Sequence, residues 1–161
     1  MSQPKKSKRF KYNLEAVLKV RDIREKQEQE KFMTAEKQYL EEQKKEEEIK
    51  EFQSQKYKEL RTIIEPGAKI SNFQEVLMRN THLGIVKTQV EEQEKVKLEA
   101  ERIKEEKREL LLKAVRDKKI IEKDKENKRE GWKKVMDKEA GKFLDDIATI
   151  GFSRKKREKE S

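Results

Sequence analysis

One short segment in the middle of the chain, Pro66 followed by Gly67, constrains the fold more than any other feature. Pro4 is the only other proline, so helix breakers are nearly absent elsewhere. About fifty residues of strong helix formers precede Pro66, and a longer stretch of the same kind follows it. Because proline disfavours helical geometry at the residue before it, the first helix should end near Glu65. The pattern predicts an all-α fold of two long helices forming an antiparallel coiled-coil hairpin, with the second helix longer.

Capping signals and composition place the boundaries within this hairpin. Asn13 is a good N-cap for the first helix, and Ser71 and Asn72 each begin a sequence with capping-box spacing that restarts the chain as a helix. We therefore expect a basic N-terminal arm at 1–12, a first helix at 13–64, a turn at 65–71, a second helix at 72–152 and a basic C-terminal tail at 153–161.

Apolar residues recur at heptad spacing in both helices, which predicts the seam between them. Polar residues such as Glu46 and Lys97 interrupt the seam, so it is thin. Folding the chain about residue 68 sets Leu14 near residue 122 and leaves the later part of the second helix without a partner. The apolar seam positions of the second helix are Val76, Leu83, Val86, Val90, Ala100, Leu111, Ala114, Ile121, Trp132 and Val135.

The composition argues against an enzyme. The chain is 48% charged and 32% hydrophobic, has no cysteine and has His82 as its only histidine. Thiolate and histidine metal sites, disulfides and a Ser-His-Asp triad are therefore excluded, and the scattered glycines form no phosphate loop. We expect no catalytic residue, cofactor or metal, and a soluble, intracellular protein, because no apolar run is long enough to span a membrane. Disorder is the competing interpretation, but mixed charges and helical spacing favour the hairpin.

The net charge of +9 is concentrated at the two ends of the chain. An antiparallel hairpin brings both termini to one end, so we expect a basic pole that docks on an acidic surface. Nucleic acid, anionic lipid and an acidic protein cavity are the candidates, and nucleic acid is disfavoured because no recognised DNA- or RNA-binding module is visible. The basic candidates are Lys5, Lys6, Lys8, Arg9, Lys11, Arg154, Lys155, Lys156 and Arg157.

Large apolar residues near the end of the second helix are further candidates for contact with a partner. Trp132 lies beyond the reach of the first helix, where it either contacts a partner or packs on its own helix or on Phe10 and Tyr12. An apolar stripe before the basic tail suits either an interfacial helix or packing against a partner or the arm. The stripe comprises Phe143, Leu144, Ile147, Ile150 and Phe152.

Two segments resemble a known family. The opening Arg9-Phe10-Lys11-Tyr12-Asn13-Leu14-Glu15-Ala16-Val17-Leu18-Lys19-Val20-Arg21 is similar to the start of the FliJ family of flagellar export proteins. That family begins with alternating aromatic and basic residues, then has Leu-Glu, Val-Leu and an Arg one turn later. The run Phe143-Leu144-Asp145-Asp146-Ile147-Ala148-Thr149 resembles the family's Leu-Asp-Glu-(Ile/Leu)-Ala run before a basic tail, with Asp146 where the family often has Glu.

The resemblance implies a role as a non-enzymatic stalk and export chaperone or escort. Such proteins are similar to the coiled-coil stalk of the rotary gamma subunit of F-type ATP synthases. The implied partners are the hexameric flagellar export ATPase, a membrane protein of the export gate and export chaperones, with no small-molecule substrate. The implied location is the cytoplasm, peripherally associated with the inner membrane at the flagellar basal body.

On this reading, the basic pole contacts the ATPase, and the start of the second helix, with Leu83 and Val86 expected to be exposed, contacts the gate. Ordinary seam packing is the alternative for Leu83 and Val86. A generic coiled-coil scaffold, the equivalent stalk of a virulence-type secretion system and a basic coiled coil that binds nucleic acid are the alternative functions.

Overall fold

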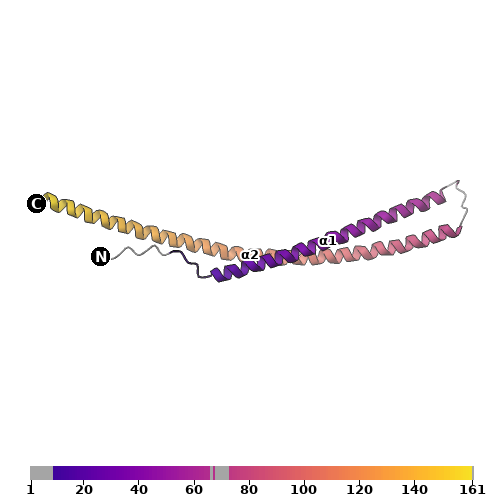
Figure 1. Cartoon of the computed structure of the whole chain (residues 1–161), viewed down its shortest axis with the longest axis horizontal. Helices are drawn as coiled ribbons and strands as arrows, with labels where there is room; N and C mark the ends of the chain where they lie inside the picture. Colours follow the sequence, from indigo (N-terminus) through magenta and orange to yellow (C-terminus); the bar gives the residue numbers. More distant parts are fainter. Residues whose placement is uncertain (1–8, 66, 68–72, 161) are drawn as a thin grey trace. The chain divides into compact units, whose positions relative to one another are not determined.

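The computed structural model describes residues 9–65, 67 and 73–160, and these residues form two long helices. Helix α1 spans Glu15–Ile64 and helix α2 spans Phe73–Glu160 (Figure 1). The predicted all-α hairpin with a longer second helix is confirmed, and no strand occurs among the described residues. The chain divides into two compact units: a central unit, Arg24–Ala114, and a terminal unit that combines Met1–Ile23 with Val115–Ser161.

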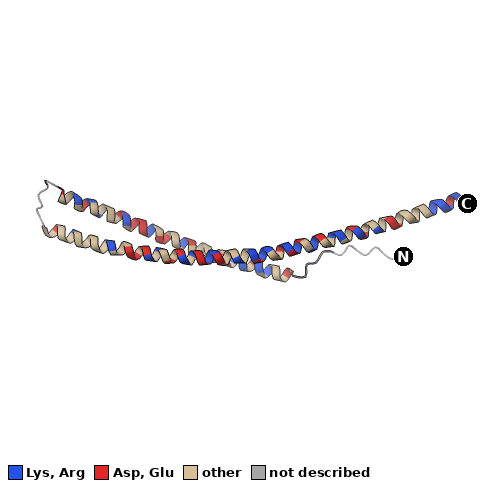
Figure 2. Ribbon diagram, turned by 180° about the vertical axis from the view of Figure 1, so that it is seen from behind, with Lys and Arg blue, Asp and Glu red and all other residues tan. Residues whose placement is uncertain are grey.

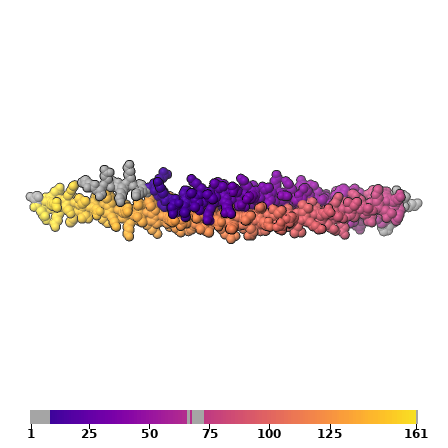
Figure 3. Space-filling model, turned by 90° about the horizontal axis from the view of Figure 1, so that it is seen from below, coloured from indigo at the N-terminus to yellow at the C-terminus, as the bar shows by residue number. Residues whose placement is uncertain are grey.

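In the central unit, α1 and α2 run antiparallel and pack along the predicted seam. In the space-filling view the side chains of the two helices are in contact there (Figure 3). The buried apolar residues of this unit are small or β-branched, apart from one leucine, which lets two helices approach closely. They are Ala35, Leu83, Val86, Val90, Ala100 and Ala114.

In the terminal unit, the residues before α1 and its first turns pack against α2. Tyr12 and Ile121 are buried, and the Tyr12 hydroxyl lies 3.4 Å from the Ile121 carbonyl oxygen. Arg21 donates a 2.8 Å hydrogen bond to the Asp117 carbonyl, and Lys118 forms a 2.8 Å ion pair with Asp22. These pairings agree with a chain folded back about residue 68.

Helix α1 begins at Glu15, after a turn at Asn13 and Leu14, where the Leu18 amide donates a 3.0 Å hydrogen bond to the Leu14 carbonyl. The Glu15 carboxylate lies in the first turn, where the helix dipole favours negative charge. Gly67, between the helices, has φ of +98°, a conformation that glycine adopts without steric cost. The predicted capping residues Ser71 and Asn72 lie outside the described residues.

Helix α2 continues to Glu160, past the expected end at residue 152, so the described part of the expected basic tail is helical. No proline interrupts residues 153–160, and Arg157 and Lys159 place positive charge in the last turn, where the helix dipole favours it. Every residue from 137 to 160 is exposed.

Candidate partner-binding surfaces

The first candidate surface is the basic N-terminal arm. Arg9 and Lys11 are exposed, while Lys5, Lys6 and Lys8 lie outside the described residues. Between the two exposed cations, Phe10 turns toward α2 and contacts Trp132. The alternation of basic and aromatic residues therefore separates two roles, because the aromatic side chains anchor the arm and leave the cations in solvent.

The second candidate surface is the basic C-terminal cluster, Arg154, Lys155, Lys156 and Arg157, which is exposed on the last turns of α2. Figure 2 shows this cluster as a blue end that follows a largely tan stretch of helix. Phe10 lies beside Trp132, and Arg154 lies about 33 Å farther along the axis of α2 at 1.5 Å per residue. Among the described residues, continuous helix therefore separates the C-terminal cluster from Arg9 and Lys11. The expectation of a single basic pole also depends on Lys5, Lys6 and Lys8, which lie outside the described residues, and it stays a prediction.

The arm is fixed to α2 by a set of aromatic and polar contacts around Tyr12. The Tyr12 hydroxyl donates a 2.5 Å hydrogen bond to the Asp124 carboxylate, and Lys128 and Lys125 lie 5.5 and 6.0 Å from the ring centre. Burial raises the pKa of Tyr12 to about 12, and the hydrogen bond to Asp124 acts in the same direction. Lys125 also pairs with Glu15 at 2.8 Å, so the arm and the start of α1 are held to one stretch of α2.

Trp132 is half-buried against Phe10, with ring centres 5.9 Å apart and planes tilted by 49°. Of the two roles expected for Trp132, the structure shows packing on the arm. Such tilted aromatic pairs lie within the favourable range of ring geometries.

Leu83 and Val86 are buried, with Val86 only 1% exposed, so the expectation that they form an exposed surface is wrong. They lie three residues apart on the face of α2 that packs against α1, where each fills a seam position. The exposed apolar residues at the start of α2 are instead Phe73, Leu77 and Met78. They lie outside the a and d positions, which is why a search along the seam misses them.

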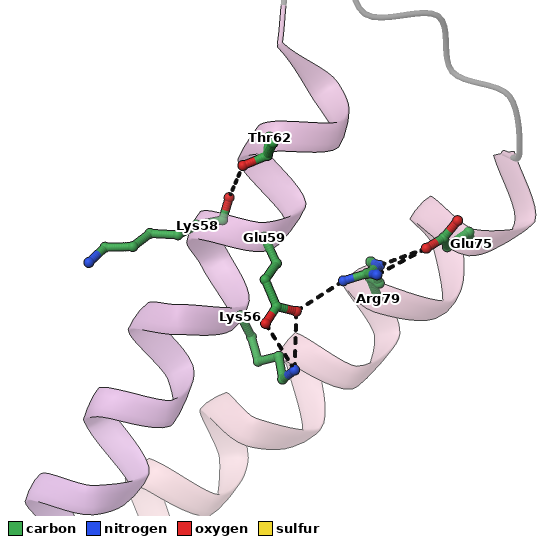
Figure 4. A network of polar contacts seen from close by, with 6 residues as sticks. All are labelled: Lys56, Lys58, Glu59, Thr62, Glu75 and Arg79. Atoms are coloured by element: carbon green, nitrogen blue, oxygen red, sulfur yellow. Dashed lines mark hydrogen bonds and ion pairs between the residues drawn. The ribbon is translucent and has the colours of Figure 1, made fainter.

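Next to this exposed apolar start, a polar network joins the two helices (Figure 4). Arg79 of α2 donates hydrogen bonds of 3.0 Å to Glu59 of α1 and 3.0 and 3.1 Å to Glu75 of its own helix. The hydrogen bond from Lys56 lowers the pKa of Glu59, and Arg79 contributes to the same shift. The network fixes this end of α2 against α1 and leaves Phe73 and Leu77 outside it.

A shallow hollow of about 420 Å³ adjoins the same network, lined by Met78, His82 and the network's own charged residues. His82 is exposed, and its ring meets Phe52 of α1 edge-on with centres 6.0 Å apart. His82 is thus a surface residue that also contributes a contact between the two helices. The hollow is open and charged, which suits contact with a macromolecule better than enclosure of a small ligand.

A polar layer interrupts the seam of the central unit at Glu46. Its carboxylate is buried, accepts a 2.5 Å hydrogen bond from Lys50 and forms a 2.7 Å ion pair with Lys97 of α2. Lys50 also pairs with Glu94 at 3.0 Å. The hydrogen bonds from Lys50 and then Lys97 lower the pKa of Glu46. One step along the seam, the Gln93 amide donates to the Glu42 carboxylate at 2.7 Å. The charged groups of these layers are paired within the hairpin, so we assign them a structural role.

Within the described ranges, no group of three or more acidic or histidine side chains is placed to hold a metal ion. In the same ranges, neither helix has an apolar stretch of the length that crossing a bilayer requires.

A family model described as the flagellar FliJ protein matches residues 10–157. The comparisons with curated proteins and with solved structures gave no significant match. The matched range includes both helices nearly to their ends, with the aromatic-basic arm at its start and the C-terminal basic cluster at its end.

Proposed function

Because the chain belongs to the FliJ family of coiled-coil proteins associated with flagellar type III export, we propose that it is a non-enzymatic stalk and export chaperone. In this role it binds the hexameric export ATPase, links the ATPase to a membrane protein of the export gate and receives export chaperones. It acts in the cytoplasm, at the inner-membrane face of the flagellar basal body. The observation that carries the proposal is the family match over both helices of the hairpin.

We assign the ATPase contact to the basic residues at both ends of the terminal unit. Arg9, Lys11 and the C-terminal cluster are exposed, and an exposed cationic side chain steers association with an acidic surface. The anchored aromatic residues Phe10 and Tyr12 hold the described part of the arm in one place, which reduces the entropy lost on binding.

Two charge-neutralised variants test this assignment. One carries Gln at Lys5, Lys6, Lys8, Arg9 and Lys11, and the other carries Gln at Arg154, Lys155, Lys156 and Arg157. Calorimetric titration against the purified export ATPase should show at least about tenfold weaker binding for each, with the loss smaller at high salt. Gate binding in a pull-down should change less. Unchanged ATPase affinity in both variants would show that these basic residues do not contact the ATPase.

We assign the gate contact to the exposed apolar start of α2, Phe73, Leu77 and Met78, since Leu83 and Val86 are committed to the seam. Leu77→Asp should weaken capture of the gate protein and leave ATPase affinity unchanged. Leu98→Asp is the matched control, because Leu98 is an equally large, exposed apolar residue of the same helix outside this patch. Equal loss of gate capture in both variants would refute the assignment.

A further inference from the structure

The apolar stripe near the end of α2 does not continue the seam that packs against α1. In the seam, Ile121, Lys125 and Trp132 follow a fixed heptad frame. Beyond Val135, that frame meets only polar residues, at Glu139, Lys142, Asp146 and Thr149. The apolar residues stand one position later, at Ala140, Phe143, Ile147 and Ile150. One residue corresponds to about 100° around a helix, so the stripe faces a different direction from the seam.

The shifted residues have the spacing of a coiled-coil seam in their own right. Met136, Ala140, Phe143, Ile147 and Ile150 alternate in steps of four and three, which is the a/d pattern over two heptads. Leu144 widens the stripe, whereas Phe152 falls on the opposite side of the helix. Phe143, Ile147 and Ile150 are each at least half exposed, whereas Ile121, at a seam position earlier in α2, is buried.

The residues that flank this stripe are acidic. Asp137, Glu139 and Asp146 occupy the e and g positions of the shifted frame, while Lys138 and Lys142 fall on the far side of the helix. In a coiled coil, e and g side chains contact the e and g side chains of the partner, so an acidic border selects a basic one. An anionic membrane surface would meet these carboxylates, because interfacial helices carry lysine and arginine beside the apolar face.

Charge also disfavours a second copy of this chain as the occupant. An antiparallel pair of α2 ends sets Glu139 of each copy near Asp146 of the other, because g positions face g positions in that arrangement. A parallel pair sets the cluster Arg154–Arg157 beside its own copy. The first eight residues of the chain cannot fill the stripe either, because Met1 is their only large apolar side chain.

We propose that residues 136–151 of α2 form a docking surface for an amphipathic helix of another protein, with apolar a/d residues and basic e/g residues. This site goes beyond the proposed ATPase contact, which uses basic side chains and so requires an acidic partner surface. The two sites lie next to each other on α2 and select partners of opposite charge.

Two synthetic peptides of about three heptads test the proposal, both with leucine at a and d. One carries lysine at every e and g position, and the other carries glutamate there. Titrated into the full-length chain at physiological salt, the lysine peptide should bind at least about tenfold more tightly, since each opposite-charge pair contributes a few tenths of a kcal/mol and each like-charge pair opposes binding. Equal affinity for the two peptides would overturn the proposal.

Matched variants locate the site. Ile147→Asp should weaken lysine-peptide binding at least about tenfold, while Ile120→Asp, at an exposed isoleucine earlier in α2, should not change it. Asp146→Lys should weaken the same binding and its neighbour Asp145→Lys, on the far side of the helix, should not. Neutralising Arg154, Lys155, Lys156 and Arg157 should leave peptide binding intact, which separates this test from that of the ATPase contact.

The other occupants give distinct results. Sedimentation of the full-length chain should show no self-association through Ile147, so wild type and Ile147→Asp should sediment alike. Flotation with vesicles containing anionic lipid should likewise show no binding that depends on Ile147. Self-association or vesicle binding through Ile147 would overturn the proposal in favour of a second copy or a membrane.

Discussion

The Tyr12 hydroxyl donates a 2.5 Å hydrogen bond across the terminal unit to the Asp124 carboxylate, although 112 positions separate the two residues in sequence. Tyr12 precedes α1, and Asp124 lies on α2 at a position that the hairpin brings alongside. Together with the packing of Phe10 on Trp132, this contact positions residues 9–12, which include Arg9 and Lys11.

Tyr12→Phe should lower the thermal midpoint by a few degrees, because it keeps the ring and removes the hydrogen bond. The pKa of Tyr12 is raised to about 12 in the folded chain, above its ordinary value of 10.0. Its contribution to stability is therefore complete below pH 10 and is lost as the pH rises toward 12. The stability difference between wild type and variant should shrink over that range. Tyr57→Phe, at an exposed tyrosine, is the control and should show neither effect.

Glu46→Gln should lower the free energy of unfolding at neutral pH by about 1 kcal/mol, because it removes the charge that accepts from Lys50 and Lys97. The pKa of Glu46 is lowered below its ordinary value of 4.5, so the stabilisation is present above that pH and lost as the pH falls through the lowered pKa. Urea denaturation at a series of acidic pH values gives the free energy of unfolding of wild type and of Glu46→Gln as two curves against pH. They should converge at low pH, and Glu47→Gln, at an exposed neighbour, should follow wild type throughout.

Val86→Ala should destabilise the hairpin by about 2 kcal/mol, because it removes methyl groups from the most completely buried side chain. Ile85→Ala, next to it and more than half exposed, should cost less than about 0.5 kcal/mol. Chemical denaturation gives both values. A small effect at Val86 together with lost gate binding would restore the original expectation that this residue faces a partner.

Gly67→Ala and Gly84→Ala should change the stability of the hairpin in opposite directions. Gly67 has φ of +98°, where a side chain is strained, so alanine should destabilise by about 1 kcal/mol. Gly84 lies inside α2, where an added Cβ meets nothing within 4 Å, so alanine should stabilise by up to about 1 kcal/mol. Thermal denaturation of the two variants compares them directly. Destabilisation by both would show that Gly84 has a packing role.

Much of the fold could be predicted because each half of the chain obeys local rules. The heptad spacing of the seam positions from Leu14 to Lys125 can be read from the sequence alone. In the structure all of these positions are buried or half-buried. The helix start at Glu15 and the helical C-terminal cluster were less predictable, because capping residues fix an end only within a few positions.

The candidate surfaces were predicted less well than the fold. Leu83 and Val86 read equally as seam or surface, because periodicity gives the face of a helix but not what covers it. Phe73 and Leu77 were missed for the same reason, since they fall outside the seam. The acidic residues around Ile147 are visible in the sequence. They can be recognised as the border of a separate apolar stripe only when the structure shows which heptad frame packs against α1.

The sequence by itself determined that two helices form, where the chain turns, which residues make the seam and to which family the chain belongs. These properties depend on local propensity, a proline, a glycine and periodicity, all of which act within a few residues. Only the tertiary structure decided that Tyr12 meets Asp124, that Trp132 packs on Phe10 and that the stripe around Ile147 is left exposed. Those contacts join residues far apart in the chain, and burial is a property of the folded pair of helices rather than of either helix alone.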